Sequence, residues 1–437
     1  MVANSTHHEQ ASAIMKLMAD SPLLRFPKSF LWGAATSAHQ VEGGLRNNWT
    51  EWERVHASRL ARGAAKAFDT PSVHWYRIKH EAVSPENYIS GRGIDHYHRY
   101  EKDFDIAQDL RLNTYRFSIE WSRIEPKRGE FDMVALEHYR KMIQSLRRRG
   151  IEPMVTLWHF ALPLWVEEQM GFQNPKTISD FGKYVRRVVE YLGEDVDWWC
   201  TINEPEVFAT MSYWIGLWPP QQRNMFTAIG AYASILPRAH IKAYKIIKEL
   251  YPQAKVGISK NMIWYTSQGK FVTPAIARLW NWFGNYYFLD QIKKHQDYIG
   301  LNYYFKYNLR GLKWDIDQQN PSDMGWGLHP EGMYALLKAM GHRYTQPLII
   351  TECGLADAQD ESRAWYIKEV LRNVHRAMTE GVEVRGFVYW SLLDNFEWDK
   401  GYWPKFGLVE VDRTTMKRTV RPSAREYAKI IQAGGLD

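Results

Sequence analysis

Residues 134–159 read VALEHYRKMIQSLRRRGIEPMVTLWH, a helical pattern followed directly by a strand pattern. In 134–150 the apolar residues recur at intervals of three and four, and three arginines and a glycine close the segment, which predicts an amphipathic helix. Residues 152–159 form a short run of apolar and β-branched residues, which predicts a buried strand. The alternation continues with a helical pattern at 179–193 and a strand pattern at 197–203. Strands that alternate with helices indicate parallel βαβ units.

Segments of this strand type recur through the whole chain. There are eight of them, at 30–37, 113–121, 152–159, 197–203, 254–260, 297–304, 347–352 and 385–392. No linker rich in proline, glycine or serine divides the 437 residues. Eight such units in one uninterrupted chain predict an α/β fold, a single (β/α)8 TIM barrel with extended βα loops, over residues 26–437. Residues 1–25 are expected to form a mobile or helical N-terminal extension.

An open, doubly wound sheet with an appended domain is the alternative fold. Such a sheet carries a glycine-rich phosphate turn after its first strand. Residues 33–40, GAATSAHQ, have the wrong spacing for that turn. The barrel is therefore the better prediction.

The composition is that of a globular domain with an excess of aromatic residues. Hydrophobic residues make up 45% and charged residues 24%, which excludes a disordered or collagen-like chain. Aromatic residues reach 14%, with 20 tryptophans, and amphipathic rings in such numbers are typical of sites that bind sugars. The net charge of +7 is spread over the chain without a basic stripe, so no nucleic-acid partner is expected.

Two features of the sequence indicate the cellular compartment of the protein. The two cysteines, Cys200 and Cys353, form neither a disulfide framework nor a zinc-ligand pattern, which indicates a reducing compartment. The N-terminal residues lack the pattern of a secretory signal, and no run of about 18 apolar residues occurs. We expect a cytoplasmic protein without a membrane segment.

Polar and aromatic side chains follow the predicted strands, where a barrel of this kind places its reactive groups. Glu204 and Glu352 each stand directly after an apolar strand, and a pair of carboxylates suits hydrolysis of a glycosidic bond. A single glutamate at a strand end is more often half of a structural ion pair. Two together favour a catalytic site, because other polar groups gather at the same strand ends, namely His39, Gln40, Arg116, His159, Asn203, Asn302, Tyr304 and Glu397.

Four motifs resemble those of glycoside hydrolase family 1, the β-glucosidase and β-galactosidase family. They are FPKSFLWGAATSAHQVEGG (26–44), TINEP (201–205), IITECG (349–354), and YWSLLDNFEW (389–398) with GLVEVDRTTMKRTVRPSA (407–424). The resemblance implies a retaining, exo-acting β-glycosidase that hydrolyses small β-glycosides and oligosaccharides through a covalent glycosyl-enzyme. It implies no metal or organic cofactor and leaves a homo-oligomer open.

The resemblance also implies roles for single residues. Glu204 would be the acid/base and Glu352 the nucleophile, with carboxyl groups about 5 to 5.5 Å apart. Catalytic support would come from Arg116, Asn203, Asn302 and Tyr304, with Asn203 on the sugar 2-hydroxyl and with Arg116 and Tyr304 on Glu352. Substrate-binding positions would be Gln40, His159, Trp326, Trp390, Glu397 and Trp398, with Trp326 on the leaving-group side.

The chain departs from the family pattern at four places. Phe160 and Ala161 stand where the family commonly has tryptophan and aspartate, and Cys353 replaces an asparagine. We expect Cys353 to be a buried filler. The connection 261–297 is short, which predicts a trimmed rim of the barrel. Residues 55–92 are divergent and receive no assignment.

Two other functions remain open within this fold. A 6-phospho-β-glycosidase would typically carry serine at Glu397, and lysine and tyrosine at Pro404 and Phe406, and a carboxylate at Glu397 would repel a phosphate. A non-catalytic sugar-binding barrel would lack one of the two carboxylates, whereas this chain has both Glu204 and Glu352. The preferred sugar and leaving group stay undetermined.

Overall fold

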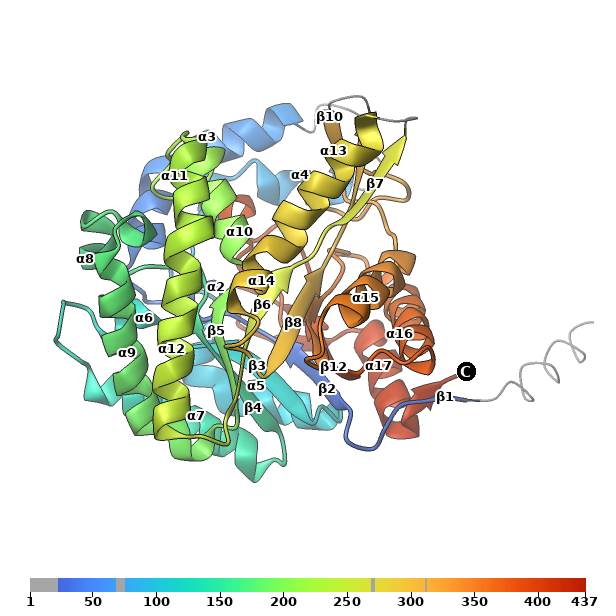
Figure 1. The fold of residues 1–437 in the computed structure, drawn as a ribbon, viewed down its shortest axis with the longest axis horizontal. Coiled ribbons are helices and arrows are strands. Elements are labelled where there is room, and N and C mark those ends of the chain that lie inside the picture. Colours follow the sequence, from blue (N-terminus) through green and yellow to red (C-terminus); the bar gives the residue numbers. More distant parts are fainter. Residues whose placement is uncertain (1–22, 68–74, 269–271, 311–312) are drawn as a thin grey trace, which may run out of the picture.

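A closed barrel of eight parallel strands forms the centre of the protein (Figure 1). The computed structural model describes residues 23–67, 75–268, 272–310 and 313–437. Each of the eight predicted strand segments overlaps one barrel strand, with differences of one residue at β6, β11 and β12, so the (β/α)8 prediction is confirmed. Around the barrel these are β2 (Leu31–Ala35), β3 (Thr114–Ser118), β4 (Glu152–Trp158), β5 (Trp198–Asn203), β6 (Lys255–Asn261), β8 (Tyr298–Tyr303), β11 (Leu348–Cys353) and β12 (Val384–Trp390).

Helices that follow the strands pack around the barrel. One helix per strand completes the βα units, and most neighbouring helices contact one another, from α5 to α14 and from α15 to α17. In chain order they are α5 (His96–Asp109), α7 (Met133–Arg148), α9 (Lys176–Leu192), α12 (Leu236–Leu250), α14 (Tyr287–Ile292), α15 (Glu331–Arg343), α16 (Arg363–Thr379) and α17 (Pro422–Ala433).

The unit formed by α7 and β4 shows why the sequence folds in this way. The carboxylate of Asp132 caps α7 by accepting from the backbone N–H groups of Val134 and Ala135, at 2.8 and 3.0 Å. At the other end Gly150 adopts φ +70°, which lets the chain turn into the strand. The buried side chains of α7 form one face, and every residue of β4 after Glu152 is buried between the barrel interior and the helices.

Long connections cover the C-terminal end of the barrel. They carry helices in the loops after β2, β3, β4, β5 and β12, and these loops hold five of the twelve candidate site residues. The elements are α2 (Ala38–Val41), α3 (Asn48–Ala67), α4 (Trp75–Ala82), η1 (Pro85–Tyr88), α6 (Trp121–Ile124), α8 (Leu164–Glu168), η2 (Gly171–Gln173), α10 (Pro205–Phe208), η4 (Ala209–Trp214), α11 (Met225–Gly230), η5 (Ala231–Ile235) and η7 (Trp398–Lys400). Another short helix, η3 (Gly193–Asp195), follows α9 directly.

The connection between β6 and β8, although short, contains a strand and helices that form part of the barrel rim. It holds β7 (Trp264–Gln268), α13 (Val272–Asn281) and η6 (Trp282–Tyr286) before α14. After β8, the hairpin β9 (Lys306–Arg310) and β10 (Lys313–Ile316) joins β7 in a three-stranded sheet, with β7 and β9 parallel. This small sheet and α13 occupy the rim. The trimmed rim was predicted relative to the usual length of this connection in the family, and it stays a prediction.

The two ends of the described chain meet. β1 (Leu24–Arg25) pairs antiparallel with β15 (Gly435–Leu436), so residues 24–25 of the predicted extension belong to the fold. Residues 1–22 lie outside the described residues. A second antiparallel pair, β13 (Val409–Val411) and β14 (Arg418–Val420), precedes α17.

Candidate active site

A cavity of about 830 Å³ opens at the C-terminal end of the barrel, and Glu204 and Glu352 both line it. Nine of the twelve predicted site residues line this cavity. The other three lie behind it, and each hydrogen-bonds a carboxylate that lines it: Gln40 bonds Glu397, Arg116 bonds Glu352 and Asn302 bonds Glu204. The structure thus brings the whole predicted set together.

Glu352, at the end of β11, is held by a cation and a phenol. The guanidinium of Arg116, on β3, donates to Oε1, and the hydroxyl of Tyr304 donates to Oε2 at 2.7 Å. Burial and the charge of Glu352 raise the pKa of Tyr304 well above its usual range, so the phenol keeps its proton and remains a donor. Both oxygens of the carboxylate therefore face groups that stabilise a negative charge.

Glu204, at the end of β5, has a different environment. Its Oε1 accepts one hydrogen bond from the neutral amide of Asn302, at 2.8 Å. Burial, with the nearby charges of Glu352 and Glu206, raises its pKa well above the usual range. Glu204 adopts φ +40° immediately before Pro205 begins α10, a left-handed conformation that costs energy in a residue other than glycine. Glu204 and Glu352 therefore stand in different environments: Glu204 has one neutral donor and negative charge nearby, and Glu352 faces a cation and a phenol.

Two asparagines connect the glutamates. Arg116 donates to Oδ1 of Asn203 at 2.7 Å, and the amide nitrogen of Asn203 lies 3.1 Å from Nε2 of His159. Asn302 accepts from the hydroxyl of Thr351 at 2.7 Å, which fixes the amide whose nitrogen faces Glu204. This network holds the side chains in place before any ligand binds.

His159 is neutral and has an unused nitrogen. Burial and the charges of Arg116 and His39 lower its pKa well below the usual range. Because Nε2 accepts from Asn203, the proton resides on Nδ1, which has no partner among the described residues. The ring stacks at 5.8 Å on Trp390, which also lines the cavity. A ligand hydroxyl is the natural acceptor for this N–H.

Glu397 and Trp398 lie on the loop after β12. Gln40 fixes this loop by donating to the carbonyl of Phe396 at 2.7 Å and to Oε2 of Glu397 at 3.2 Å. Burial, Glu352 and Asp399 raise the pKa of Glu397 to about 8. The predicted repulsion of a 6-phosphate by a charged Glu397 is therefore weaker than the sequence suggests.

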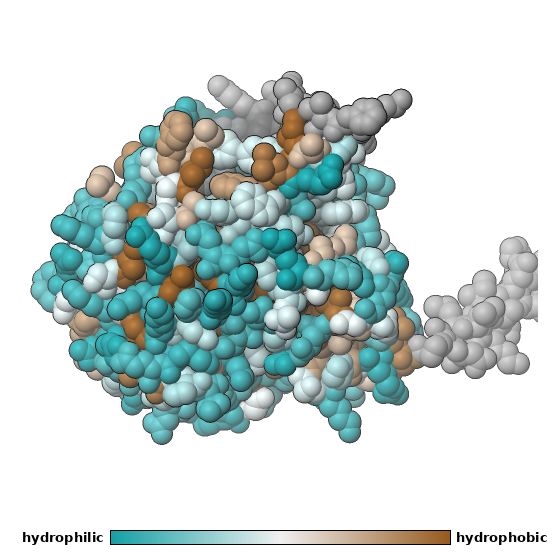
Figure 2. All heavy atoms as spheres, viewed as in Figure 1, coloured by the Kyte–Doolittle hydropathy of each residue, from teal (hydrophilic) through white to brown (hydrophobic). Residues whose placement is uncertain are grey.

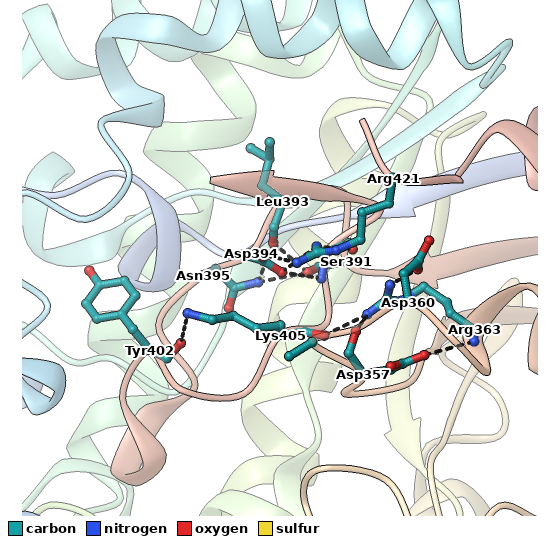
Figure 3. Close-up of polar contacts among 12 residues, drawn as sticks. Asp357, Asp360, Arg363, Ser391, Leu393, Asp394, Asn395, Tyr402, Lys405 and Arg421 are labelled. Atoms are coloured by element: carbon teal, nitrogen blue, oxygen red, sulfur yellow. Dashed lines mark hydrogen bonds and ion pairs between the residues drawn. The ribbon is translucent and has the colours of Figure 1, made fainter. Parts of the chain in front are cut away.

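Polar anchors under the same loop keep its shape (Figure 3). Asp394 forms an ion pair of 2.8 Å with Arg421, which also donates to the carbonyl of Gly407 at 2.7 Å. The amide of Asn395 donates to Ser391 at 2.8 Å, while its oxygen accepts from Gln40 at 2.9 Å. These contacts tie the loop that bears Glu397 to the strand that precedes it and to the start of α17.

A close approach of two strand ends needs a glycine. A Cβ on Gly354 would lie 1.8 Å from the carbonyl oxygen of Trp390. Without that side chain, the ends of β11 and β12 can approach closely, and Glu352 and Trp390 line the same cavity. Trp326, which also lines the cavity, packs against Tyr304 and Phe305, with ring centroids 5.9 and 5.0 Å apart.

The departures at Phe160 and Ala161 are buried replacements. Phe160 adopts φ +70° and packs against Trp218 and Trp398, with ring centroids 5.0 and 5.1 Å apart. Ala161 is buried and accepts from the indole N–H of Trp158 at 2.9 Å. A ring and a small side chain thus fill the space behind Trp398.

Cys353 is buried, and burial raises its pKa to about 12. The other cysteine, Cys200, is also buried. Since thiolate and access are both needed for reaction, we expect 5,5′-dithiobis(2-nitrobenzoic acid) to titrate no thiol in the native protein and two after unfolding in guanidinium. Rapid native labelling with loss of activity would contradict this expectation.

Sequence reasoning missed a buried ion pair below Glu204. Lys260, at the end of β6, lies 2.9 Å from Glu206, and both side chains are shielded from solvent. Glu206 follows the end of β5 and Lys260 lies near the end of β6, so the sequence shows a charged residue at each strand end. The pairing register of β5 and β6 is needed to show that the two side chains meet.

A (β/α)8 barrel with two glutamates of unlike environment at its C-terminal end defines the site of a glycoside hydrolase. Comparisons with known proteins agree. The sequence model described as glycosyl hydrolase family 1 matches residues 24–298 and 276–436, and the chain belongs to this family. The chain is accordingly a glycosyl hydrolase of the β-glycosidase type.

Named relatives span nearly the whole chain. Beta-glucosidase A of Thermotoga maritima is 31% identical, with 94% of this chain and 99% of the relative covered. A beta-galactosidase of Pyrococcus woesei is 30% identical, with 94% and 98% covered. The solved structure of a beta-glycosidase from Pyrococcus horikoshii superposes with a TM-score of 0.83 at 35% identity, covering 95% of this chain and 97% of that one.

None of the helices in the described residues combines the length and the apolar character needed to cross a membrane. Nor do these residues contain a group of three or more histidine, cysteine, aspartate or glutamate side chains placed to hold a metal ion.

Proposed function

We propose that the protein is a retaining, exo-acting β-glycosidase that removes the non-reducing terminal sugar of β-glycosides by double displacement. The observation that carries this proposal is the contrast between the environments of Glu204 and Glu352, which both line the cavity. Glu352 faces a cation and a phenol donor, as an ionised nucleophile requires, whereas Glu204 is buried beside negative charge and starts protonated.

In the first step, a carboxylate oxygen of Glu352 attacks the anomeric carbon and forms an ester bond. The bond from that carbon to the leaving oxygen breaks, and the proton of Glu204 passes to this oxygen. Loss of the Glu352 charge then removes one of the effects that raise the pKa of Glu204. In the second step Glu204 takes a proton from water, the water oxygen displaces the ester, and both groups return to their starting states.

Side chains around the pair are suited to hold the sugar. We assign Asn203 to the 2-hydroxyl, and Gln40, His159 and Glu397 to the other hydroxyls. Trp390 and Trp398 would supply apolar surfaces for the ring. A beta-glucosidase and a beta-galactosidase among the relatives support glucosides and galactosides as substrates, with fucosides as a further candidate.

A 6-phospho-β-glycosidase finds no support at the site. Lys400, which lines the cavity, pairs with Asp399 at 2.7 Å, and Phe406 presents a ring where a phosphate would need a donor. We also propose a cytoplasmic location, which the two buried, unpaired cysteines support, and a homo-oligomeric state.

Turnover of p-nitrophenyl β-glucoside tests the proposed function. We expect release of p-nitrophenol, with β-glucose as the first product by NMR. A panel of p-nitrophenyl galactoside and fucoside, cellobiose and lactose would then rank the sugars. Absence of turnover on every p-nitrophenyl β-glycoside would overturn the proposal, and α-glucose as first product would overturn retention.

The buried pair of Glu206 and Lys260 should set the pH range of the reaction. In Glu206→Gln the neighbouring cation Lys260 stays while a negative charge is lost, so the pKa of Glu204 should fall. The alkaline limb of the profile of kcat/KM against pH should move by roughly one unit to lower pH. A double change, Glu206→Met with Lys260→Met, removes both charges and should return the limb toward its original place. An unmoved limb in Glu206→Gln would show that the pair does not act on the acid.

A further inference from the structure

One exposed tryptophan lies outside the catalytic cavity. Of the tryptophan side chains that the structure describes, three are exposed, and two of these, Trp214 and Trp282, line the catalytic cavity. The third, Trp365, is 49% exposed and lies on α16. Figure 2 shows hydrophobic residues gathered over α11 and α13 at the top of the molecule, apart from α16. The large ring of Trp365 therefore forgoes the free energy of burial at a place of its own.

Trp365 lines a second cavity of about 360 Å³. This second cavity lies between residues 365–373 of α16 and residues 319–331, which lead from β10 into α15. The helices α15 and α16 lie side by side (Figure 1). Among the described residues none lines both cavities, so the second cavity is a separate site. Its volume falls within the roughly 300–1,000 Å³ that is usual for small-molecule sites.

One face of α16 gives the second cavity a ring, a carboxylate and an amide. Trp365, Glu369 and Asn373 follow one another at intervals of four residues, so they form a row about 12 Å long. Glu369 accepts from Arg372 through Oε1, and the amide nitrogen of Asn373 donates to the carbonyl of Glu369 at 2.9 Å. The remaining carboxylate oxygen of Glu369 and the amide oxygen of Asn373 have no partner among the described residues. Both are free to accept from a ligand.

The opposite wall carries two more free amides. Gln319 and Asn320 lie in the loop after β10, and neither side chain has a hydrogen-bond partner within the described chain. Asn320 adopts φ +48°, a conformation that asparagine tolerates better than most residues. At the start of α15, Oε1 of Glu331 lies 3.1 Å from Nδ1 of His329. This wall therefore offers donors and acceptors but little unpaired charge.

The lining of the second cavity favours a neutral ligand with several hydroxyls. No lysine or arginine lines it among the described residues, so an anion finds no cation there. Its two carboxylates, Glu331 and Glu369, already face His329 and Arg372, which weakens their attraction for an ammonium group. An exposed indole face beside amide and carboxylate oxygens matches a sugar ring, which presents C–H groups on its faces and hydroxyls around its edge.

Both walls are held in place by the rest of the fold. Asp357 caps α16 by accepting from the backbone N–H of Arg363 at 3.1 Å. The guanidinium of Arg363 is buried and donates to the carbonyls of Asp357 and Lys405, at 2.5 and 2.8 Å, which fixes the turn that bears Trp365 (Figure 3). Across the cavity, the backbone N–H of Leu328 donates to the carbonyl of Gln319 at 3.1 Å and closes the loop. Such preorganisation lowers the entropy cost of binding.

We propose that the second cavity is a non-catalytic sugar-binding site, in which Trp365 stacks on a face of a hexose unit while Asn320 and Asn373 bind its hydroxyls. The site would hold a saccharide on the enzyme away from Glu204 and Glu352. It goes beyond the proposed function, because a sugar can bind here whether or not it is cleaved in the catalytic cavity.

Fluorine NMR of protein labelled with 5-fluorotryptophan observes this site directly. The resonance of Trp365 is the one that is missing from the spectrum of Trp365→Phe. Glucose, and thio-linked cellotriose as a chain that resists hydrolysis, should shift this resonance saturably. The dissociation constant should be roughly 0.1–10 mM, since one stacked ring and a few solvent-exposed hydrogen bonds give weak binding. A Trp365 resonance that neither sugar moves at about 100 mM glucose or 10 mM cellotriose would overturn the proposal.

Variants separate the second cavity from the catalytic one. Asn320→Gly with Asn373→Ala should weaken the affinity read at Trp365 about fivefold or more, while kcat/KM for p-nitrophenyl β-glucoside stays within about twofold. Glycine suits φ +48° and alanine suits a helix, so the double variant should stay folded. The matched control is Gln144→Ala, which removes an exposed amide from α7 and should keep the affinity. Unchanged affinity in the double variant would also overturn the proposal, because the shift would then come from binding elsewhere.

Other outcomes of the titration have their own meaning. A shift of the Trp365 resonance with tetramethylammonium chloride but with neither sugar would make the second cavity a cation site and reject the proposal. A shift with sugar, combined with no turnover of any p-nitrophenyl β-glycoside, would reject the proposed function alone. Turnover of p-nitrophenyl β-glucoside with an unmoved Trp365 resonance would reject only this inference.

Discussion

Replacement of the carboxylate of Glu352 should stop turnover of every β-glycoside while leaving the barrel folded. In Glu352→Ala the oxygen that would attack the anomeric carbon is gone, and the guanidinium of Arg116 and the hydroxyl of Tyr304 face an empty space. Loss of a nucleophile from a working site costs on the order of 10⁵-fold or more in kcat. The measurement is the rate of p-nitrophenol release, with circular dichroism and thermal unfolding as checks on the fold.

Azide distinguishes a missing nucleophile from a damaged site. The cavity left by the carboxylate can admit azide, which attacks the anomeric carbon directly, so an activated glucoside should yield α-glucosyl azide, the inverted product. Glu352→Gln, which keeps the shape of the side chain, serves as the matched variant: it should be equally inactive, with little rescue. Residual activity of Glu352→Ala above about 1% of wild type, at a substrate purity that excludes contamination, would assign the nucleophile elsewhere.

The barrel was predictable because the pattern of an apolar strand followed by an amphipathic helix recurs eight times along the chain. Each strand of the type of β4 is short and apolar, and helices such as α7 present one buried face, so local patterns alone give eight units. Glu204 and Glu352 were also accessible to this reasoning, because a polar residue directly after a buried strand lies at the C-terminal end of the barrel. Strand-end positions also indicated most of the other ten site residues, and the family resemblance then gave them their roles and added Trp326.

The features of the site that the sequence did not reveal are those that depend on contacts between segments far apart in the chain. The positions of Gln40, Arg116 and Asn302 behind the cavity follow from barrel register and hydrogen bonding, to which local patterns are blind. The pKa of about 8 for Glu397 comes from burial and from Glu352 and Asp399, and Glu352 lies on another strand.

The sequence also does not reveal which tryptophans are buried and which line the cavity. Trp199 and Trp403 are buried, whereas Trp214 and Trp282 are partly exposed and line the cavity. In sequence the two kinds look alike, because an exposed apolar residue on a helix has the same spacing as a core residue. Only the packing of η4 and η6 around the opening separates them.

Removal of the acid should make the rate depend steeply on the leaving group. In Glu204→Ala no proton is available for the departing oxygen, so methyl and octyl β-glucosides should lose about 10³-fold or more in kcat/KM, within the usual range of general acid catalysis. 2,4-Dinitrophenyl β-glucoside, whose leaving group needs no proton, should lose less than about tenfold. The second step then becomes slow, since no base activates water, and a burst of dinitrophenol should precede a low steady rate.

The pH profile and azide complete the assignment of Glu204. Because burial and the charges of Glu352 and Glu206 hold its pKa well above the usual range, the wild-type profile should stay high through neutral pH and fall on the alkaline side as this proton is lost. In Glu204→Ala that alkaline limb should disappear for the dinitrophenyl substrate. Azide should now intercept the glycosyl-enzyme and give β-glucosyl azide, the retained product, opposite to the product from Glu352→Ala. Equal losses on activated and unactivated glucosides, or α-glucosyl azide from this variant, would show that Glu204 is not the acid/base.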